Sequence, residues 1–259
     1  MSHVLLVAGL DPTAGAGLAA DLEALGRLGV GGWPVAAAIT AQGPAGVRGW
    51  SPVPEAMVLA QIEALLEGGG ERPRAVKTGM LGTASLAAAL CDRLSAADLR
   101  RVPLVLDPVL LASAGTSLLD CAGAPPGEVL EPLLSRARLA TPNLPELAAL
   151  TGLPVDGDEA AIRAARALPS RAVLVKGGHR DGAPVDLLVE GRRVTRFTGR
   201  RRRGTRRGTG CRLASAVAGL LARGATLEEA VRGAKRLVER YLDAAPPAPR
   251  ATPRRRPGP

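Results

Sequence analysis

The motif Gly208-Thr209-Gly210-Cys211 is the pattern in this sequence that points most directly to chemistry. It precedes an apolar segment, 213–221, which is typical of a helix. Glycines at a helix start leave backbone N–H groups to face an anion, and the helix end adds partial positive charge. Such a site stabilises the charge that develops during phosphoryl transfer. Cys211 lies in the same turn, where a thiol pKa is lowered, so its thiolate could accept a proton from a substrate hydroxyl. The alternative is a glycine-rich helix start with an inert, buried cysteine.

Charged and polar side chains follow several apolar runs of the chain. Asp107 ends the run 104–107, and Asn143 and Glu146 follow the run 139–141. A buried carboxylate must be solvated, paired or metal-bound, and oxygen ligands of this kind suit Mg²⁺. A helix here would place Asn143 and Glu146 on one face, although Glu146 could instead merely cap that helix. Lys176, which precedes two glycines, could reach a phosphate, whereas His179 fits a hydrogen-bonding loop residue.

Residues after other apolar runs suit a flat heterocycle. Gln42 closely follows Thr40 and carries a donor and an acceptor on one amide, so it could read a heterocycle edge. Met80 is a pliable apolar side chain suited to packing against a ring. The first run ends in a glycine-rich segment, 8–17, whose spacing is not the dinucleotide-binding G-x-G-x-x-G. Each feature alone also fits a structural role, and their common placement is what favours function.

Short apolar runs alternate with longer amphipathic segments over most of the chain. The runs are nearly continuous, which is typical of strands buried on both faces of a parallel sheet. We expect strands at 3–8, 35–40, 75–78, 104–107, 139–141 and 172–176, and helices at 15–28, 54–66, 84–94, 127–137, 158–168, 211–223 and 226–242. Runs at 187–190 and 194–197, joined by Gly191-Arg192-Arg193, predict an antiparallel hairpin at one sheet edge.

This alternation predicts an α/β fold: a doubly wound, mostly parallel sheet with helices on both faces and the hairpin at its edge. Ligands of such sheets bind outside the carboxyl ends of the strands, where the residues above are expected to lie. The length of 259 residues favours one domain, 1–243, because no linker or repeat interrupts the pattern. The segment 244–259 is rich in proline and arginine and is expected to be disordered.

The formal net charge of +10 raises the question of nucleic-acid binding. Segment 199–212 holds seven arginines and segment 244–259 holds four, with no acidic residue in either, so the rest of the chain is close to neutral. Aromatic residues make up only 2%, which leaves few side chains to stack on bases. A nucleic-acid partner is therefore not expected.

The cysteines Cys91, Cys121 and Cys211 are widely spaced and lack the pairing of metal ligands. An odd number of cysteines without a signal peptide suggests a reducing compartment. The N-terminal apolar run is too short for the core of a signal peptide, and no stretch approaches the roughly 18 apolar residues of a membrane span. We therefore expect a cytoplasmic protein with no membrane contact.

The order of the motifs resembles that of the hydroxymethylpyrimidine/phosphomethylpyrimidine kinases of thiamine biosynthesis, a ribokinase-like family. The resemblance spans roughly residues 3–243 and rests on A-G-x-D-P from Ala8, G-A-G from Gly15, T-A-Q from Thr40, K-x-G-M-L from Lys77, L-D-P-V from Leu106, T-P-N-L-P-E from Thr141, V-K-G-G-H from Val175 and G-T-G-C from Gly208. It implies a kinase that uses ATP and Mg²⁺ and phosphorylates a pyrimidine alcohol and then its monophosphate. It also implies a homodimer with a small-molecule substrate.

The resemblance further assigns roles to individual positions. The pyrimidine pocket would be lined by Gly9, Ala16, Thr40, Gln42, Met80 and Val109. Asp107 and Glu146, with Asn143 nearby, would support Mg²⁺ and the phosphates, and Lys176 would contact the phosphates of ATP. The anion hole would be formed by Gly208, Thr209 and Gly210, with Cys211 in the catalytic position.

Three departures from the family pattern surround the candidate site. Gly43-Pro44 stands where Asn-Thr is usual, Thr205-Arg206-Arg207 where Asn-Thr-His is usual, and Arg212 where Thr follows the cysteine. The added arginines could clamp phosphates or distort the anion hole. The leading hypothesis is thus a pyrimidine kinase. Its alternatives are a pyridoxal or related vitamin-B6 kinase and a catalytically weak ligand-binding protein on the kinase fold.

Overall fold

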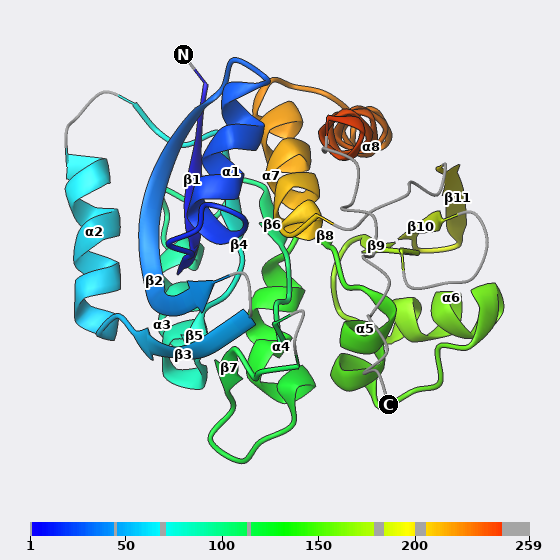
Figure 1. Cartoon of the computed structure of the whole chain (residues 1–259), viewed down its shortest axis with the longest axis horizontal. Coiled ribbons are helices and arrows are strands. Elements are labelled where there is room, and N and C mark those ends of the chain that lie inside the picture. The colour runs from blue at the N-terminus through cyan, green and yellow to red at the C-terminus, as the bar shows by residue number, and fades with distance from the viewer. Residues whose placement is uncertain are drawn as a thin grey trace, which may run out of the picture.

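The computed structural model describes residues 2–43, 46–67, 71–112, 115–178, 184–199 and 206–244. A nine-stranded sheet in the order β11-β10-β9-β8-β6-β4-β1-β2-β3 runs through it (Figure 1). The strands from β9 to β2 in that order are parallel. Their bounds are β1 His3–Leu10, β2 Gly31–Gly43, β4 Ala75–Thr78, β6 Leu104–Leu106, β8 Leu139–Ala140 and β9 Val173–Val175. The predicted doubly wound α/β sheet is confirmed.

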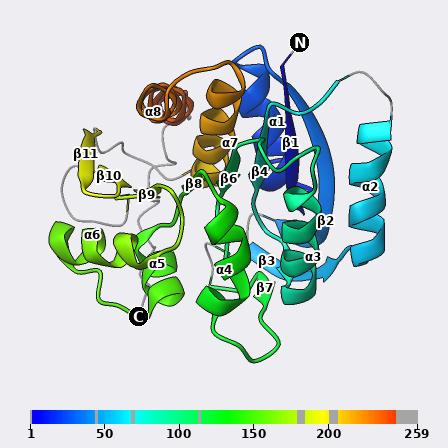
Figure 2. The same cartoon turned by 180° about the vertical axis from the view of Figure 1, so that it is seen from behind.

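Helices cover both faces of the sheet (Figures 1 and 2). One apolar core lies between the sheet and α2 (Glu55–Glu67), α3 (Ala84–Ser95), α4 (Pro126–Arg136), α5 (Leu144–Thr151) and α6 (Gly157–Ala167). A second core lies on the other face, against α1 (Gly17–Gly26), α7 (Thr209–Ala222) and α8 (Leu227–Asp243). Residues 4–8 of β1 alternate between the two cores, which explains why all five of them are apolar.

Antiparallel strands close both edges of the sheet. The predicted hairpin is present as β10 (Val185–Glu190) and β11 (Arg193–Thr198), but its turn is the pair Gly191-Arg192 because Arg193 already pairs with Glu190. At the other edge β2 continues beyond the expected 35–40 at both ends, and β3 (Gly46–Pro52) pairs with it. Neither β3 nor the small parallel pair of β5 (Gly82–Thr83) and β7 (Leu119–Asp120) was predicted from the sequence. These short segments lack a continuous apolar run and form strands through pairing with their neighbours.

Several element ends differ from the expected ones by one to three residues. Helix α1 starts at Gly17 rather than at residue 15, because the preceding residues form the turn held by Asp11. Helix α7 starts at Thr209 rather than Cys211, so the glycine motif forms its first turn. Strand β6 ends before Asp107, whose side chain turns to other partners. Residues 245–259 of the expected tail lie outside the described residues, as do His179, Pro44 and residues 200–205.

The carboxyl ends of the central parallel strands meet at one edge of the sheet. Strand β1 has β2 on one side and β4 on the other, so the chain order reverses beside it. Crevices at such reversal points are where open α/β sheets bind ligands. The first turn of α7 comes from the far end of the sequence to the same edge, since a Cβ added at Gly208 would lie 2.2 Å from the carbonyl oxygen of Gly15.

Candidate active site

Lys176 lies at the centre of a charged cluster beyond the ends of β6, β8 and β9. Its Nζ is 2.8 Å from Oδ1 of Asp107 and 3.6 Å from Oε2 of Glu146. The hydroxyl of Thr141 donates to the same Asp107 oxygen at 3.0 Å. Oδ2 of Asp107 accepts no hydrogen bond from the described residues, and it lies 3.8 Å from where a Cβ at Gly210 would stand. The strand-end lysine and carboxylates predicted from the sequence are therefore brought together.

The pKa values of the two carboxylates in this cluster are shifted in opposite directions. Burial would raise the pKa of Asp107, but the nearby Lys176 and Lys77 hold it below its usual value. Burial is the stronger influence on Glu146 and raises its pKa despite Lys176. The two carboxylates overcome the effect of burial on Lys176 and raise its pKa, so the amine stays charged. The cluster thus holds a fixed positive charge and at least one fixed negative charge.

Asn143 and Glu146 also form the cap of α5. Oδ1 of Asn143 accepts from the backbone N–H of Glu146 at 2.8 Å, and the backbone N–H of Asn143 donates to Oε2 of Glu146 at 2.8 Å. This reciprocal capping box explains the three-residue spacing of the two side chains. Glu146 therefore caps the helix, as the sequence allowed, and the Glu146 carboxylate faces Lys176 at the same time.

The glycine motif places the first turn of α7 against this cluster. Gly208 has a φ of +73°, a left-handed conformation that favours glycine. A Cβ at Gly210 would stand 3.2 Å from Nζ of Lys176, so a glycine here lets the helix start lie close to the lysine without displacing it. The N–H groups of this turn and the ammonium group together form an anion-binding corner.

The expectation of a lowered pKa for Cys211 is wrong. Burial is the largest influence and, with the negative charges of Asp21 and Asp107, raises the pKa of the thiol to about 11. Lys77 and the backbone N–H of Gly17 oppose this shift without overcoming it. At neutral pH Cys211 is therefore a thiol.

A buried ion pair lies beneath the site and was missed in the sequence analysis. Nζ of Lys77 bonds to both carboxylate oxygens of Asp21, at 2.9 and 2.8 Å, and both side chains have no exposed surface. The hydroxyl of Ser215 donates to the same carboxylate at 2.8 Å. These contacts tie β4, α1 and α7 together. A lysine within the otherwise buried run 75–78 was the available signal, since it requires a partner.

The residues expected to line a pyrimidine pocket form an apolar group and a polar group. In the apolar group, a Cβ at Gly9 would lie 2.9 Å from Sδ of Met80, and Met80 packs with Ala38, Leu118, Val109 and Trp50. In the polar group, the Thr40 hydroxyl donates to the carbonyl oxygen of Leu10 at 3.0 Å and contacts Oε1 of Gln42 at 3.3 Å. Trp50 of the unpredicted β3 adds an aromatic ring to the apolar group.

Ala16 connects these groups to the anion-binding corner. Its backbone N–H donates to Oδ2 of Asp11 at 3.0 Å, and its Cα would lie 3.0 Å from a Cβ at Gly208. Asp11 also accepts from the backbone and hydroxyl of Thr13, which fixes the turn after β1. The order of the site is thus apolar group, turn after β1, helix start and charged cluster.

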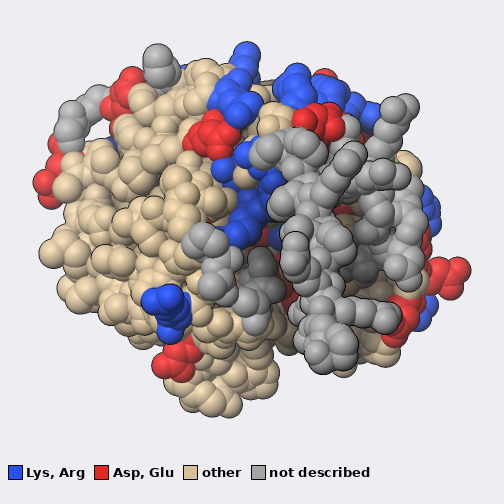
Figure 3. Space-filling view, viewed as in Figure 1, with Lys and Arg blue, Asp and Glu red and all other residues tan. Residues whose placement is uncertain are grey.

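Two of the three described arginines around the glycine motif are held by Tyr241 of α8. The guanidinium groups of Arg206 and Arg212 each lie 3.9 Å from the centre of its ring. Arg212 is buried, bonds to Glu23, and donates to the carbonyl oxygens of Gly15 and Gly208 at 3.0 and 3.3 Å. Figure 3 shows basic side chains gathered in the middle of the face on which α7 begins. Arg212 therefore supports the anion-binding corner from behind.

A family model described as phosphomethylpyrimidine kinase matches residues 11–251. The chain belongs to this kinase family. A hydroxymethylpyrimidine/phosphomethylpyrimidine kinase of Streptomyces coelicolor is 41% identical over 243 residues, which cover 91% of this chain and 86% of the relative.

Solved structures resembling this phosphomethylpyrimidine kinase family member are ribokinase-like kinases. A phosphomethylpyrimidine kinase from Clostridium difficile 630 is 31% identical, with a TM-score of 0.78 over 93% of this chain and all of that one. A pyridoxal kinase from Staphylococcus aureus, in complex with AMP-PCP and pyridoxal, is 30% identical, with a TM-score of 0.81 over 94% of this chain and 89% of that one. Overall shape therefore does not separate pyrimidine from pyridoxal substrates.

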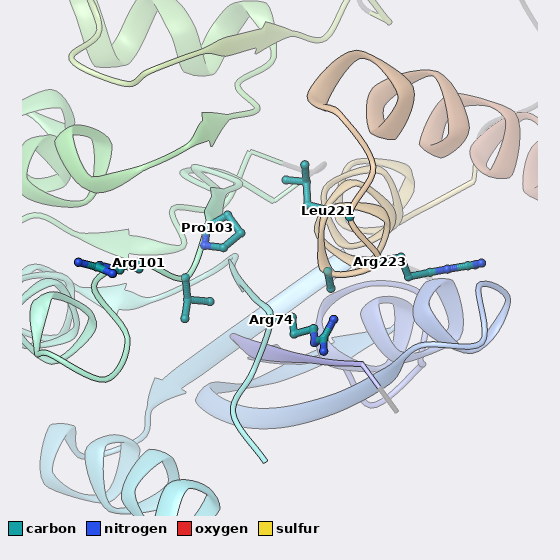
Figure 4. A pocket seen from close by; sticks show the side chains of 8 residues that line it. Arg74, Arg101, Pro103, Leu221 and Arg223 are labelled. Carbon is teal, nitrogen blue, oxygen red and sulfur yellow. The ribbon is translucent and has the colours of Figure 1, made fainter. Parts of the chain in front are cut away.

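A hollow at the opposite end of the sheet is distinct from this candidate site. It has a volume of about 430 Å³ and is lined by the amino ends of β4 and β6 and the last turn of α7 (Figure 4). The side chains of Arg101 and Arg223 extend from it to opposite sides. It is far from the carboxyl ends of the strands, so we do not assign the kinase chemistry to it. Among the described residues, no helix is long and apolar enough to cross a membrane.

Replacing Arg212 in this family member should destabilise the fold. We expect Arg212→Met to lower the free energy of unfolding by about 2–4 kcal/mol, because several carbonyl oxygens and Glu23 lose a charged donor. Urea unfolding measures the change. The matched control is Arg27→Ala, which removes the exposed partner of the same Glu23 and should cost less than about 1 kcal/mol. Equal effects of the two changes would contradict a supporting role for Arg212.

Proposed function

We propose that this protein phosphorylates 4-amino-5-hydroxymethyl-2-methylpyrimidine and its monophosphate, with ATP as phosphoryl donor, in thiamine biosynthesis. The observation that carries the proposal is the close approach of Lys176 and Asp107 to the glycine turn of α7, where a Cβ added at Gly210 would lie 3.2 Å from Nζ of Lys176. That corner can hold a transferring phosphoryl group. The family and the named activity of the Streptomyces coelicolor relative support the choice of substrate.

The corner would act mainly through position and charge. The acceptor oxygen forms a bond to the γ-phosphorus of ATP as the bond from that phosphorus to the β–γ bridging oxygen breaks, and ADP leaves. The N–H groups of residues 208–211 and the ammonium group of Lys176 stabilise the equatorial oxygens. Only the thiolate form of Cys211 can accept the acceptor proton, and with a pKa of about 11 this form is the minor one at neutral pH.

The two carboxylates suit a Mg²⁺ ion whose remaining ligands are phosphate oxygens and waters. Mg²⁺ in kinases is held by one or two carboxylates together with phosphate oxygens and waters. Asp107 keeps one oxygen without a described partner, and Glu146 faces the same lysine. The described residues contain no cluster of three or more metal-binding side chains, so the protein alone offers an incomplete site. Bound Mg²⁺ would neutralise phosphate charge, and Asp107 and Glu146 would hold it, while Asn143 is engaged in the cap of α5.

The apolar and polar groups beside β1 would hold the pyrimidine. Met80 and Val109 would pack on the ring, Gln42 would bond to its amino edge, and Gly9 and Ala16 would complete the lining. The glycine at position 9 leaves room for the Met80 side chain. Thr40 would orient Gln42 through its contact with Oε1. We extend the proposal to a cytoplasmic homodimer whose catalytic unit is one domain, 1–243, and sedimentation of the purified protein tests the oligomeric state.

A pyridoxal kinase is the second candidate, because a pyridoxal kinase bound to pyridoxal has a TM-score of 0.81 to this chain. The test is ADP release from Mg-ATP with the pyrimidine alcohol, its monophosphate, pyridoxal or no acceptor. We expect release with both pyrimidines, little with pyridoxal, and none after chelation of Mg²⁺. Release with pyridoxal alone would favour the second candidate. No release from folded protein with any acceptor would favour a catalytically weak binding protein.

A further inference from the structure

Arg207 belongs to the stretch before Gly208 that departs from the family pattern, and its side chain faces the candidate site. It directly precedes Gly208, and its carbonyl oxygen accepts from the Tyr241 hydroxyl at 3.2 Å and from Nη1 of Arg212 at 3.3 Å. These bonds fix its backbone beside the anion-binding corner. Unlike Arg206 and Arg212, it does not contact the Tyr241 ring.

The Arg207 side chain crosses the gap between the corner and the acceptor pocket. Nη2 donates to Oδ2 of Asp11 at 2.9 Å, and Nη1 donates to the carbonyl oxygen of Gly43 at 3.3 Å. Asp11 holds the turn that contains Ala16, and Gly43 follows Gln42 in β2. Both ends of the contact therefore adjoin residues of the proposed pyrimidine pocket.

The guanidinium group has donors to spare for an anion. A guanidinium carries five N–H donors, and the described contacts of Arg207 use two. Its side chain is 31% exposed, whereas that of Asp11 is 3% exposed. An anion can thus reach the group from the open side while Asp11 holds it in place. Two N–H donors in a planar fork match the oxygens of a phosphate.

The two proposed acceptors differ in the charge that they bring to this position. The alcohol is neutral, but the monophosphate brings a phosphate whose oxygen must reach the same corner to attack the γ-phosphorus. In the proposed binding mode that phosphate would lie between the pyrimidine and the helix start, which is the gap that Arg207 spans. We propose that Arg207 is a specificity-determining residue that favours a phosphate-monoester acceptor over the corresponding alcohol. This inference rests on the proposed function.

The test compares both acceptors in matched variants. We expect Arg207→Gln to lower kcat/KM for the monophosphate about 10- to 100-fold, since a charge-assisted contact is lost, and to change that for the alcohol less than about threefold. Arg207→Lys keeps the positive charge but lacks the planar pair of N–H donors, so its kcat/KM for the monophosphate should lie between those of the wild type and Arg207→Gln. Arg206→Gln, which alters the neighbouring arginine held by Tyr241, should leave the ratio of the two values unchanged. Thermal melting establishes that each variant is folded.

A binding measurement separates this inference from the proposed function. Calorimetric titration without ATP should show weaker binding of the monophosphate, but not of the alcohol, to Arg207→Gln. Equal losses for both acceptors, or none for the monophosphate, would overturn the inference and leave the kinase assignment intact. A wild-type protein that neither binds nor phosphorylates either pyrimidine would overturn both.

Discussion

Replacing Cys211 by alanine is expected to lower kcat by about 10²- to 10⁴-fold, the contribution of a positioned proton-transfer group. The affinity for ATP should stay within about twofold, because the N–H groups of the helix start and Lys176 remain in place. Steady-state ADP release gives kcat, and titration with an ATP analogue gives the affinity. An unchanged kcat would remove Cys211 from the mechanism.

The Cys211 prediction can be separated from a general packing effect. Cys211→Ser keeps the size of the side chain, but its hydroxyl ionises far less readily than a thiol, so it should lose nearly as much kcat as the alanine variant. Cys91→Ala is the matched control, since this cysteine lies in α3 on the opposite face of the sheet and should leave kcat unchanged. Loss of kcat in the control as well would point to global perturbation rather than to proton transfer.

The raised pKa of Cys211 also predicts how the reactivity of its thiol depends on pH. With a pKa of about 11, only about one thiol in ten thousand is ionised at pH 7. Alkylation of Cys211 by iodoacetamide, in a protein lacking Cys91 and Cys121, should therefore accelerate up to about pH 10 without levelling off near neutrality. A plateau reached near pH 7 would show the lowered pKa that the helix start alone suggests.

The sheet and most of its helices could be predicted from apolar patterning alone. Strand β1 is apolar at every buried position because cores lie on both of its faces, and a single sequence carries that pattern. Strand β3 carries no such pattern, and it forms by pairing with a strand that continues beyond its apolar run. Apolar patterning therefore predicts strands that are buried on both faces and misses strands that are held mainly by pairing with a neighbour.

The proximity of the candidate residues was more predictable than their electrostatics. Asp107, Glu146 and Lys176 were expected to meet because they follow neighbouring strands, and they do. The pKa of Cys211 is raised first by burial and then by Asp21 and Asp107, which come from distant parts of the chain, so its direction could not be read from the local motif. The same holds for Arg212, whose partner Tyr241 is supplied by the last helix.

Replacing Lys77 by methionine is expected to cost about 3–5 kcal/mol of stability, the largest loss among the substitutions considered for the fold. The change leaves the Asp21 carboxylate fully buried with the Ser215 hydroxyl as its remaining described partner. Removing both charges avoids this, so Lys77→Met combined with Asp21→Leu should recover most of the loss. Urea unfolding of the two single variants and the double variant gives the coupling between the residues.

The double variant also distinguishes a structural role from a catalytic one. The ion pair joins β4, α1 and α7 directly beneath the glycine turn, so a stable double variant tests whether the turn needs charge or only packing below it. Lys77 lowers the pKa of Cys211 and Asp21 raises it, so their joint removal changes the thiol less than either single change. We therefore expect the double variant to regain kcat along with stability. Recovered stability with kcat still low would instead assign Lys77 a role in the phosphoryl transfer itself.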